Sequence, residues 1–290
     1  MKDFTYVSPS SIVEVVGLLS ENEGCAALLA GGTDLLVQLR NTNSDVDVVI
    51  DVKRISQLND ISYDVDNGLS VGAAVSCSQI YQSDIILEKY PIIIDAASII
   101  GGKAIQNRAS FGGNVCNSSP SGDAIGAMMA LGATCEIVGS NGVRTVPIKE
   151  FFIAPGKNIL MTDEMLVALK VPAPKQDSGS GYIRFTPRAE MDIAVAGVGS
   201  YLEVDRKSDQ ILSARIALVA VAPTPVLSTS AAQMLVGNTP TENIIQMAAS
   251  LAQESISPIT DVRGTAVQRK HLIGVLTKRS LNLAVSRVKQ

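Results

Sequence analysis

Histidine and paired cysteines, which supply most metal centres and many acid–base sets, are scarce in this chain. Its 290 residues include one histidine, His271, and four cysteines, Cys25, Cys77, Cys116 and Cys135. No two cysteines form a CxxC pair and none lies near His271. This pattern argues against a zinc site, a Cys-ligated iron–sulfur cluster or a disulfide framework. No Ser-His-Asp set stands out either, so the chemistry of such an enzyme would fall to a cofactor.

Long apolar runs and a strong net charge are missing as well. The run Ile211–Val221 is interrupted by Ser213 and Arg215 and is too short for a membrane span. Residues Met1–Val7 show no basic region followed by an apolar stretch, so no signal peptide is predicted. These absences indicate a soluble, cytoplasmic protein. The net charge of -4 gives no reason to expect nucleic acid as a partner.

The composition instead supports a large folded core. Hydrophobic residues make up 46% of the chain and charged residues 18%, and a length of 290 residues predicts two or three domains. In the first sixty residues a helix is expected over Ser8–Leu19, with Ser8 as its cap, and strands over Ala26–Ala30 and Asp47–Val52. This order indicates a small α/β unit.

A second unit is predicted from residue 61 to about residue 171. Asp66-Asn67-Gly68 separates two strand-like segments, Ile61–Val65 and Leu69–Val75, and is a hairpin signal. The other elements expected here are helices at Cys77–Lys89, Ile92–Ile100 and Ala124–Leu131 and strands at Thr134–Val138, Val143–Pro147 and Glu164–Val171.

The segment Pro172–Gly181, rich in Pro, Gly and Ser, is the predicted linker to a third unit. Paired strands are expected over Ala194–Val204 and Ile211–Val221, followed by helices over about Thr241–Ala252 and Thr265–Val288. The chain as a whole is predicted to be α+β, with a break near residue 175.

The first of two glycine-bearing segments is Leu29–Leu36. An apolar strand runs into Gly31-Gly32-Thr33 and then into a helix-like Asp-Leu-Leu. Glycine lets the backbone approach a ligand and turn its N–H groups toward a diphosphate, to which a helix start adds its positive end. Taken alone, this segment is more typical of a plain strand–turn–helix connection.

The second glycine-bearing segment runs from Ser110 to Asp123 and joins Gly112-Gly113 to Asn, Ser and Asp side chains. Backbone donors together with these acceptors suit a sugar-phosphate or ribityl chain. The alternative is a long surface loop rich in turn residues. The apolar helices predicted on both sides, and Phe111 within the segment, favour a binding loop.

Taken together, the motifs Ala30–Leu35, Phe111–Asn114 and Ser119–Asp123, with about eighty residues between the two glycine pairs, carry a family resemblance. They resemble the FAD-binding medium subunit of molybdenum hydroxylases, the xanthine and carbon monoxide dehydrogenase family. The stretch Gly181–Val198, which contains Asp-Ile-Ala, and Asp261–Ala266 followed by an arginine resemble further segments of that family. The likeness therefore runs nearly end to end.

The resemblance implies a two-subdomain FAD-binding fold of the vanillyl-alcohol-oxidase (PCMH) type, followed by a C-terminal α+β domain. The FAD-binding domain would span residues 1–175, with subdomains of about 1–58 and 59–175. The C-terminal domain would span residues 176–290 and resemble that of CO dehydrogenase flavoproteins. FAD would lie between the two subdomains.

By position, the resemblance assigns the FAD diphosphate to the first glycine segment and the diphosphate or ribityl region to the second. Asp123 would accept from a sugar hydroxyl, Ile193 would pack on the flavin ring, and the backbone near Leu166 would contact its polar edge. Many relatives carry a lysine where this chain has Arg184 or Phe185, so Arg184 is predicted as a substitute cation near the flavin. The predicted cofactor-binding residues are Leu29, Ala30, Gly31, Gly32, Thr33, Asp34, Leu35, Ser110, Gly112, Gly113, Asn114, Ser118, Asp123, Leu166, Arg184 and Ile193.

The resemblance further implies an electron-transfer role in a heterotrimer, with no catalytic residue in this chain. Electrons would pass from a large molybdopterin-binding subunit to a small [2Fe–2S] subunit, then to FAD, and finally to NAD, a quinone or oxygen. Two alternatives stay open: a free-standing flavin-dependent reductase or oxidase, and a structural subunit that has lost its flavin. The first needs an acid or base that the sequence does not offer, and two intact glycine motifs disfavour the second.

The segment Asp261–Gln290 is strongly basic. It carries seven basic residues against one acid, a difference of +6 in an otherwise acidic protein. A solvated helix face and a docking face for an acidic partner explain this charge about equally well. His271 is expected on the same helix surface. The basic residues are Arg263, Arg269, Lys270, Lys278, Arg279, Arg287 and Lys289.

Overall fold

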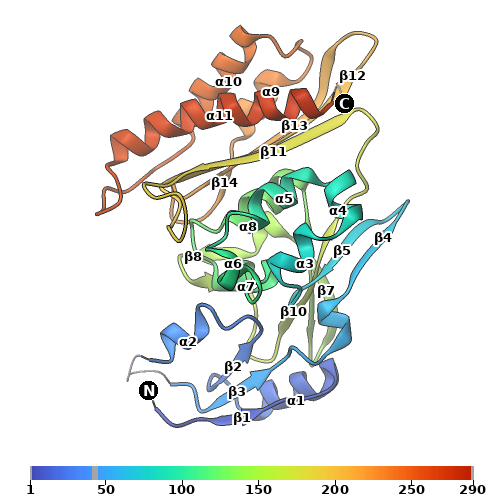
Figure 1. Cartoon of the computed structure of the whole chain (residues 1–290), viewed down its shortest axis with the longest axis vertical. Coiled ribbons are helices and arrows are strands. Elements are labelled where there is room, and N and C mark those ends of the chain that lie inside the picture. The colour runs from blue at the N-terminus through green and yellow to red at the C-terminus, as the bar shows by residue number, and fades with distance from the viewer. Residues whose placement is uncertain (1, 41–44, 289–290) are drawn as a thin grey trace.

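The computed structural model describes residues 2–40 and 45–288. Three units follow one another along the long axis: an N-terminal sheet, a central sheet with its helices, and a C-terminal sheet with a second group of helices (Figure 1). Each unit combines strands with helices, and the central and C-terminal sheets are antiparallel with their helices grouped together in the chain, which confirms the predicted α+β class. Within the described residues, no helix is both long and apolar enough to cross a membrane.

The N-terminal unit is a three-stranded parallel sheet in the order β1-β3-β2. Its helix α1 buries Val15 and Leu19, which explains the apolar periodicity in the sequence. The short helix α2 follows β2 across the first glycine segment. The elements are β1 (Thr5–Val7), α1 (Ile12–Glu21), β2 (Ala26–Leu29), α2 (Leu35–Gln38) and β3 (Val48–Asp51).

Helix α1 begins three residues later than predicted, because Ser11 and not Ser8 caps it. The Ser11 hydroxyl accepts the Glu14 N–H at 3.2 Å. The Glu14 carboxylate in turn accepts the Ser10 N–H at 2.8 Å. A carboxylate in the first turn that satisfies a preceding N–H makes this the better start site.

The central unit is a five-stranded antiparallel sheet in the order β4-β5-β10-β6-β7. The predicted hairpin between β4 and β5 is confirmed, and Gly68 has the positive φ of +85° that its turn requires. Helix α8 is buried along its whole length. The strands are β4 (Ile61–Asp64), β5 (Gly68–Gly72), β6 (Thr134–Gly139), β7 (Gly142–Pro147) and β10 (Met165–Val171), with a small hairpin of β8 (Phe152–Ala154) and β9 (Lys157–Asn158). The helices are η1 (Ser56–Asn59), α3 (Cys77–Tyr81), α4 (Asp84–Lys89), α5 (Pro91–Ala97), α6 (Lys103–Gln106), α7 (Phe111–Asn117), α8 (Asp123–Leu131) and η2 (Ile148–Glu150).

The C-terminal unit is a four-stranded antiparallel sheet in the order β11-β12-β13-β14. Helix α11 packs on one face of this sheet, and α5 and α8 of the central unit meet the other (Figure 1). A Cβ added to Gly199 would lie 2.5 Å from the Gly126 carbonyl oxygen, so β12 approaches the backbone of α8 closely only because residue 199 is glycine. The elements are β11 (Ser178–Phe185), β12 (Ala196–Asp205), β13 (Gln210–Val219), β14 (Val226–Leu227), α9 (Thr229–Leu235), α10 (Glu242–Glu254) and α11 (Ala266–Val288).

The predicted linker Pro172–Gly181 is wrong in its second half, because β11 already begins at Ser178. The glycines there serve packing and not flexibility. A Cβ added to Gly179 would lie 2.0 Å from the Ala284 carbonyl oxygen of α11. A sequence rich in Gly and Ser is therefore a strand with a helix pressed against it.

Four further segments differ from prediction. The helix expected over Cys77–Lys89 is two short helices, α3 and α4, because Ser83 leaves the helical conformation with ψ of 114°. The helix expected over Ile92–Ile100 spans Pro91–Ala97. Helix α9 was not predicted. The Gly112-Gly113 segment, predicted as a loop, is the start of helix α7, with Ser110 as its cap.

Candidate functional site

The two glycine segments meet across one cavity between the N-terminal and central units. Its volume is about 340 Å³. One wall is the connection from β2 into α2, and the facing wall is α7 with the residues before it. The lining residues are Leu28, Ala30, Gly31, Gly32, Thr33, Asp34, Leu35, Gln38, Ile100, Ala109, Ser110, Gly113, Asn114, Cys116, Asn117 and Gly156. Segments about eighty residues apart thus line a single cavity, and their binding of FAD stays a prediction.

The first wall offers backbone donors to a ligand. Gly32 has φ of +77°, a conformation that other residues adopt only with strain. Among the described residues, the N–H groups of Gly32, Thr33 and Asp34 donate to no other part of the chain. Desolvation raises the pKa of the Asp34 carboxyl. Because the N–H groups of Gly32, Thr33 and Asp34 have no partner within the described part of the chain, the loop presents a short run of free donors, which is the arrangement that binds phosphate oxygens.

The second wall combines a capped helix start with an enclosed acceptor. The Ser110 hydroxyl accepts the Gly113 N–H at 3.0 Å. The side-chain Oδ1 of Asn114 is buried and has no hydrogen-bond partner among the described residues. This oxygen lies beside Gly122, where an added Cβ would be 2.7 Å from it, so the chain itself encloses the atom.

The four glycines of the motifs have different roles. A Cβ on Gly31 would lie 2.2 Å from the Arg108 carbonyl oxygen, and one on Gly112 would lie 2.3 Å from that of Ala73. These two glycines let parts of the chain touch each other. A Cβ on Gly113 would meet only the Ser110 hydroxyl, at 3.1 Å, and would otherwise point into open space. Gly113 is therefore the glycine whose bare backbone leaves room for a ligand.

The cavity fits a dinucleotide of the FAD type. Free N–H groups on one wall suit a diphosphate, and the polar residues Ser110, Asn114 and Asn117 on the other suit a chain that carries hydroxyls. Cys116 also lines the cavity, but burial raises the pKa of its thiol to about 12, so it remains neutral. Within the described residues, no three His, Cys, Asp or Glu side chains are grouped to hold a metal ion.

The structure brings nine of the sixteen predicted site residues into the cavity lining. They are Ala30, Gly31, Gly32, Thr33, Asp34, Leu35, Ser110, Gly113 and Asn114. The other seven lie outside this lining. They are Leu29, Gly112, Ser118, Asp123, Leu166, Arg184 and Ile193.

Helical spacing could have found one of the lining residues that the sequence reasoning missed. Ser110, Gly113, Asn114 and Asn117 follow the i, i+3, i+4, i+7 pattern of one helix face. Had a helix been predicted here, Asn117 would have been included among the site residues and Gly112 excluded from them. No comparable local signal points to Gly156, which reaches the cavity from the β8–β9 turn. The other missed residues are Leu28, Gln38, Ile100, Ala109 and Cys116.

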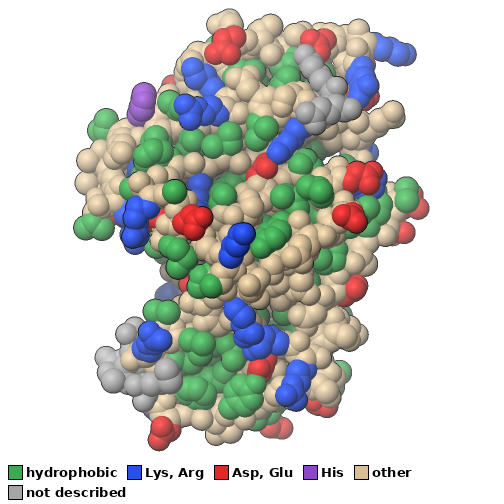
Figure 2. All heavy atoms as spheres, viewed as in Figure 1, with side chains coloured by type: hydrophobic (Ala, Val, Ile, Leu, Met, Phe, Trp, Pro, Cys, Tyr) green, Lys and Arg blue, Asp and Glu red, His purple; other side chains and the backbone are tan. Residues whose placement is uncertain are grey.

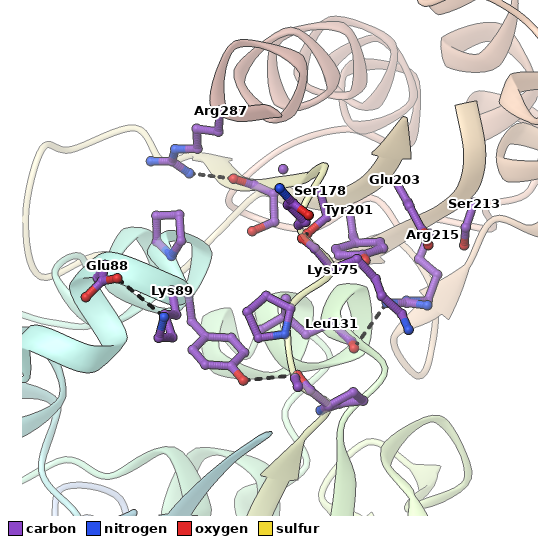
Figure 3. Close-up of a pocket in the computed structure, with 18 of the residues that line it drawn as sticks. Glu88, Lys89, Leu131, Lys175, Ser178, Tyr201, Glu203, Ser213, Arg215 and Arg287 are labelled. Atoms are coloured by element: carbon purple, nitrogen blue, oxygen red, sulfur yellow. Dashed lines mark hydrogen bonds and ion pairs between the residues drawn. The ribbon is translucent and has the colours of Figure 1, made fainter. Parts of the chain in front are cut away.

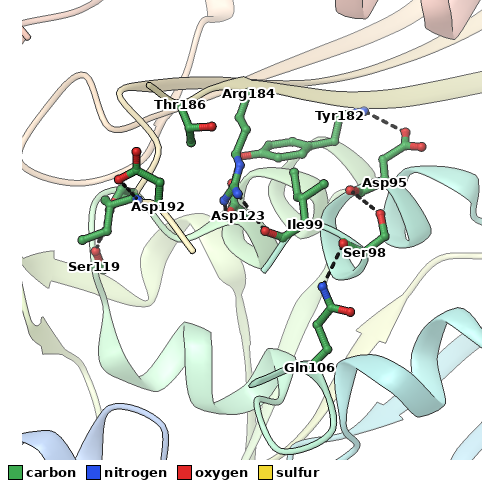
Figure 4. A network of polar contacts seen from close by, with 12 residues as sticks. Asp95, Ser98, Ile99, Gln106, Ser119, Asp123, Tyr182, Arg184, Thr186 and Asp192 are labelled. Carbon is green, nitrogen blue, oxygen red and sulfur yellow. Dashed lines mark hydrogen bonds and ion pairs between the residues drawn. The ribbon is translucent and has the colours of Figure 1, made fainter. Parts of the chain in front are cut away.

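Asp123 and Arg184 form a buried ion pair between the central and C-terminal units (Figure 4). The second oxygen of Asp123 accepts the Tyr182 hydroxyl at 2.8 Å, and Arg184 also donates to the Ile99 carbonyl at 2.7 Å. Burial raises the pKa of Asp123 to about 6, while Arg184 and Tyr182 limit the rise. Both carboxylate oxygens are thus engaged by the chain itself, and a sugar-hydroxyl role for Asp123 stays a prediction.

Three more of the predicted residues have partners or positions of their own. Ser118 ends α7 in the left-handed conformation, and its buried hydroxyl donates to the Val115 carbonyl at 3.0 Å. Leu166 is buried within β10, at an irregularity in its pairing with β6. Ile193 is 47% exposed, unusual for isoleucine. Contact of Leu166 or Ile193 with a flavin ring stays a prediction.

The C-terminal Asp-Val-Arg-Gly-Thr-Ala motif has a structural explanation. Arg269 is buried and donates to the Val195 carbonyl at 2.7 Å and the Ala220 carbonyl at 2.9 Å. It also pairs with Asp261 at 2.7 Å. One arginine thereby joins the start of α11 to the segment that follows Ile193.

The expectation of an outward-facing basic helix needs correction at two residues. Arg269 is buried, and Arg287 is paired with Asp95 of α5 at 2.6 Å. Lys289 lies outside the described residues. Arg263, Lys270 and Arg279 are exposed and Lys278 is half-buried, and His271 is exposed as predicted (purple in Figure 2).

Comparison with known proteins adds the family. The family model described as the FAD binding domain in molybdopterin dehydrogenase matches residues 2–174, and that of the CO dehydrogenase flavoprotein C-terminal domain matches residues 182–284. The xanthine dehydrogenase FAD-binding subunit of Escherichia coli O157:H7 is 32% identical, over 99% of this chain and 98% of its own length. The carbon monoxide dehydrogenase medium chain of Hydrogenophaga pseudoflava is also 32% identical, over 98% of each chain.

Solved structures agree with these sequence relatives. A chain of carbon monoxide dehydrogenase from Hydrogenophaga pseudoflava superimposes with a TM-score of 0.94 at 30% identity, over 99% of this chain and 98% of that one. A chain of quinoline 2-oxidoreductase from Pseudomonas putida 86 gives a TM-score of 0.91 at 28% identity, over 99% and 98%.

Proposed function

This chain belongs to the FAD-binding subunits of molybdenum hydroxylases, the xanthine and carbon monoxide dehydrogenase family, and from that premise we propose that it is the electron-transfer subunit of a heterotrimeric complex. Its FAD would receive electrons from the [2Fe–2S] clusters of a small partner subunit. A large partner subunit would hold the molybdopterin cofactor and oxidise the substrate. The external acceptor would be NAD, a quinone or oxygen, and the complex would work in the cytoplasm.

The observation that carries the proposal is the single cavity formed by both glycine segments, with the free N–H groups of the first segment and Gly113 of the second lining it. N–H groups without partners and a bare backbone that faces open space suit a bound ligand. FAD supplies the redox chemistry when bound, and the chain's residues bind and orient it.

We propose the following division of work within the chain. The loop Leu29–Leu35 would hold the diphosphate through its free N–H groups, and Gly113 and Asn114 would contact the ribityl region. Ile193 would exclude water from one face of the flavin ring, which is consistent with its exposed position on the surface of this chain alone. The units would be domains of residues 1–175, divided near residue 58, and 176–290.

Assembly gives the direct test. The three genes are expressed together, and the complex is purified through a tag on this subunit under mild conditions. We expect both partners to be recovered with it, and flavin absorbance near 370 and 450 nm, as roughly expected of a bound oxidised flavin. Recovery of this chain alone, or substrate-dependent flavin reduction by the isolated chain, would instead support the free-standing flavoenzyme.

A further inference from the structure

A second and larger cavity lies at the joint between the central and C-terminal units, and the flavin site leaves it unexplained. Its volume is about 450 Å³, and none of its lining residues lines the glycine cavity. The segment Pro172–Gln176 passes along one side, α4 and α5 form another, and β11 to β13 form the third (Figure 3). The volume is in the range of sites that hold small organic ligands.

The charges in this wall do not cancel. Lys89 pairs with Glu88 at 3.3 Å, and Arg287 pairs with Asp95. Arg215 and Lys175 have no carboxylate within ion-pair distance among the described residues. Glu203 is the one remaining acid in the lining, so two unpaired cations face one carboxylate. The cavity is therefore electropositive, and an anion would be attracted to it.

Arg215 is held in a fixed orientation at the cavity wall. Its Nε donates to the Ala130 carbonyl at 2.7 Å and its Nη2 to the Leu131 carbonyl at 3.2 Å, at the end of α8. Its guanidinium carbon lies 4.3 Å from the centre of the Tyr201 ring. A planar cation that is oriented before a ligand arrives loses little entropy on binding a carboxylate.

The rest of the wall mixes polar side chains with flat ring and proline surfaces. The rings of Tyr63 and Tyr201 contribute to it, together with Pro91, Pro172 and Pro174. The Tyr90 hydroxyl donates to the Pro172 carbonyl at 3.0 Å, which fixes the proline segment against the central unit. Ring faces and prolines suit a flat organic body better than a bare inorganic ion.

We propose that this joint cavity binds a small organic anion, a carboxylate on a flat apolar body, with Arg215 and Lys175 as the anion-binding residues. Because the walls belong to both units, an occupant would link them and stabilise the joint. The site is separate from the flavin cavity, so binding would leave FAD content unchanged.

Benzoate is the probe for the test, with the FAD-loaded complex as the protein. We expect saturable binding by calorimetry and a rise in the melting temperature. Lys175→Glu should weaken benzoate at least tenfold, and Ser213→Phe, which fills the cavity, should abolish binding. Lys207→Glu, at the exposed β12–β13 turn, is the matched control and should change nothing.

Three outcomes would overturn the proposal: no saturable benzoate binding to the wild type, binding that survives both cavity variants, or inorganic phosphate binding as tightly as benzoate. The last would mean that the flat wall contributes nothing. Arg215→Lys serves as a second variant that keeps a cation at the α8 terminus while losing the planar group. It should fold, retain FAD and bind benzoate more weakly than wild type.

Discussion

The two joints of the molecule are built from different interactions. Between the central and C-terminal units, three arginines of the C-terminal unit cross the joint: Arg184 to Asp123, Arg287 to Asp95, and Arg215 to the carbonyls at the end of α8. Between the N-terminal and central units, Gln38 donates to Asn117 at 3.2 Å across the glycine cavity, and Thr162 donates to Glu23 at 3.1 Å away from it.

The two joints differ in how much of their bonding the chain itself supplies. The N-terminal unit packs on the central sheet through an apolar cluster that includes Ile50, Met165 and Val167, and its cavity side is joined by the Gln38–Asn117 hydrogen bond. At the arginine joint, Arg184 and Arg287 are paired with carboxylates of the central unit. The cavity joint leaves N–H groups of the first glycine segment free among the described residues, so bound FAD would act as part of the structure there. The first three predictions below each change one joint and follow both stability and FAD binding.

The largest effect is expected from Asp123→Ala, which leaves Arg184 charged and unpaired in a buried site. The side chains of both residues are only 7% exposed. Removing one partner of a buried pair costs about 3–5 kcal/mol. Chemical denaturation should show this loss of stability, and FAD should be lost only as the protein unfolds. A fully stable variant with a weaker FAD affinity would restore the sugar-hydroxyl role for Asp123.

The next largest effect is expected from Gly113→Val, which fills space at the cavity wall and should lower FAD affinity more than about a hundredfold, or roughly 3 kcal/mol. Its melting temperature without FAD should stay near that of the wild type without FAD. Gly112→Val is the matched control, because its side chain would strike the Ala73 backbone. The Gly112→Val variant should have a lower melting temperature even without FAD, because the new side chain disturbs the fold. If the purified Gly113→Val variant still contained stoichiometric FAD, this face of α7 would not belong to the FAD site.

A smaller effect is expected from Arg287→Ala at the edge of the arginine joint. Arg287 makes two bonds to Asp95, at 2.6 and 2.8 Å, and both side chains are about one-fifth exposed. Loss of such a pair should cost about 1–3 kcal/mol of unfolding free energy, with FAD content unchanged. Arg279→Ala on the exposed side of the same helix should stay within about 0.5 kcal/mol. Equal effects of the two changes would show that the joint gains nothing from its charge pair.

The exposed basic residues of α11 belong to neither joint and test the docking hypothesis. Lys278→Glu with Arg279→Glu should alter the stability of the isolated subunit by less than about 1 kcal/mol. If this face meets an acidic partner, assembly should weaken by about tenfold at low salt and the difference should shrink at high salt. Unchanged assembly at low ionic strength would leave the surface as a solvated helix face.

The smallest change in stability is expected from Ile193→Ala. The side chain is 47% exposed, so its loss should cost less than about 1 kcal/mol. The flavin should nevertheless change its reduction potential or its reactivity with oxygen, because one face of the ring would gain water. Spectroelectrochemical titration measures this, with Val262→Ala as an exposed apolar control. A drop in stability with unaltered flavin chemistry would make Ile193 an ordinary packing residue.

Much of the fold follows from local sequence patterns. The hairpin at Asp66-Asn67-Gly68, the antiparallel strands β12 and β13 and the long helix α11 were predictable because each depends on turn chemistry or on a repeat of apolar residues. The packing role of two glycines in β11 was not predictable. Gly179 and Gly181 look like linker residues in sequence, yet they allow α11 to press on β11. Only the tertiary structure shows what a missing side chain makes room for.

The sequence by itself determined the family, the cofactor and the two glycine segments that meet at one cavity, because both motifs are short and continuous in the chain. It could not separate Gly113, which faces the cavity, from Gly112, which faces Ala73. The two glycines lie on different faces of helix α7, and the sequence had predicted a loop there. Nor could it show that Asp123, Arg184 and Tyr182 satisfy one another. Asp123 lies about sixty residues before the other two in sequence. Only the packing of two units brings the three side chains together in a buried place.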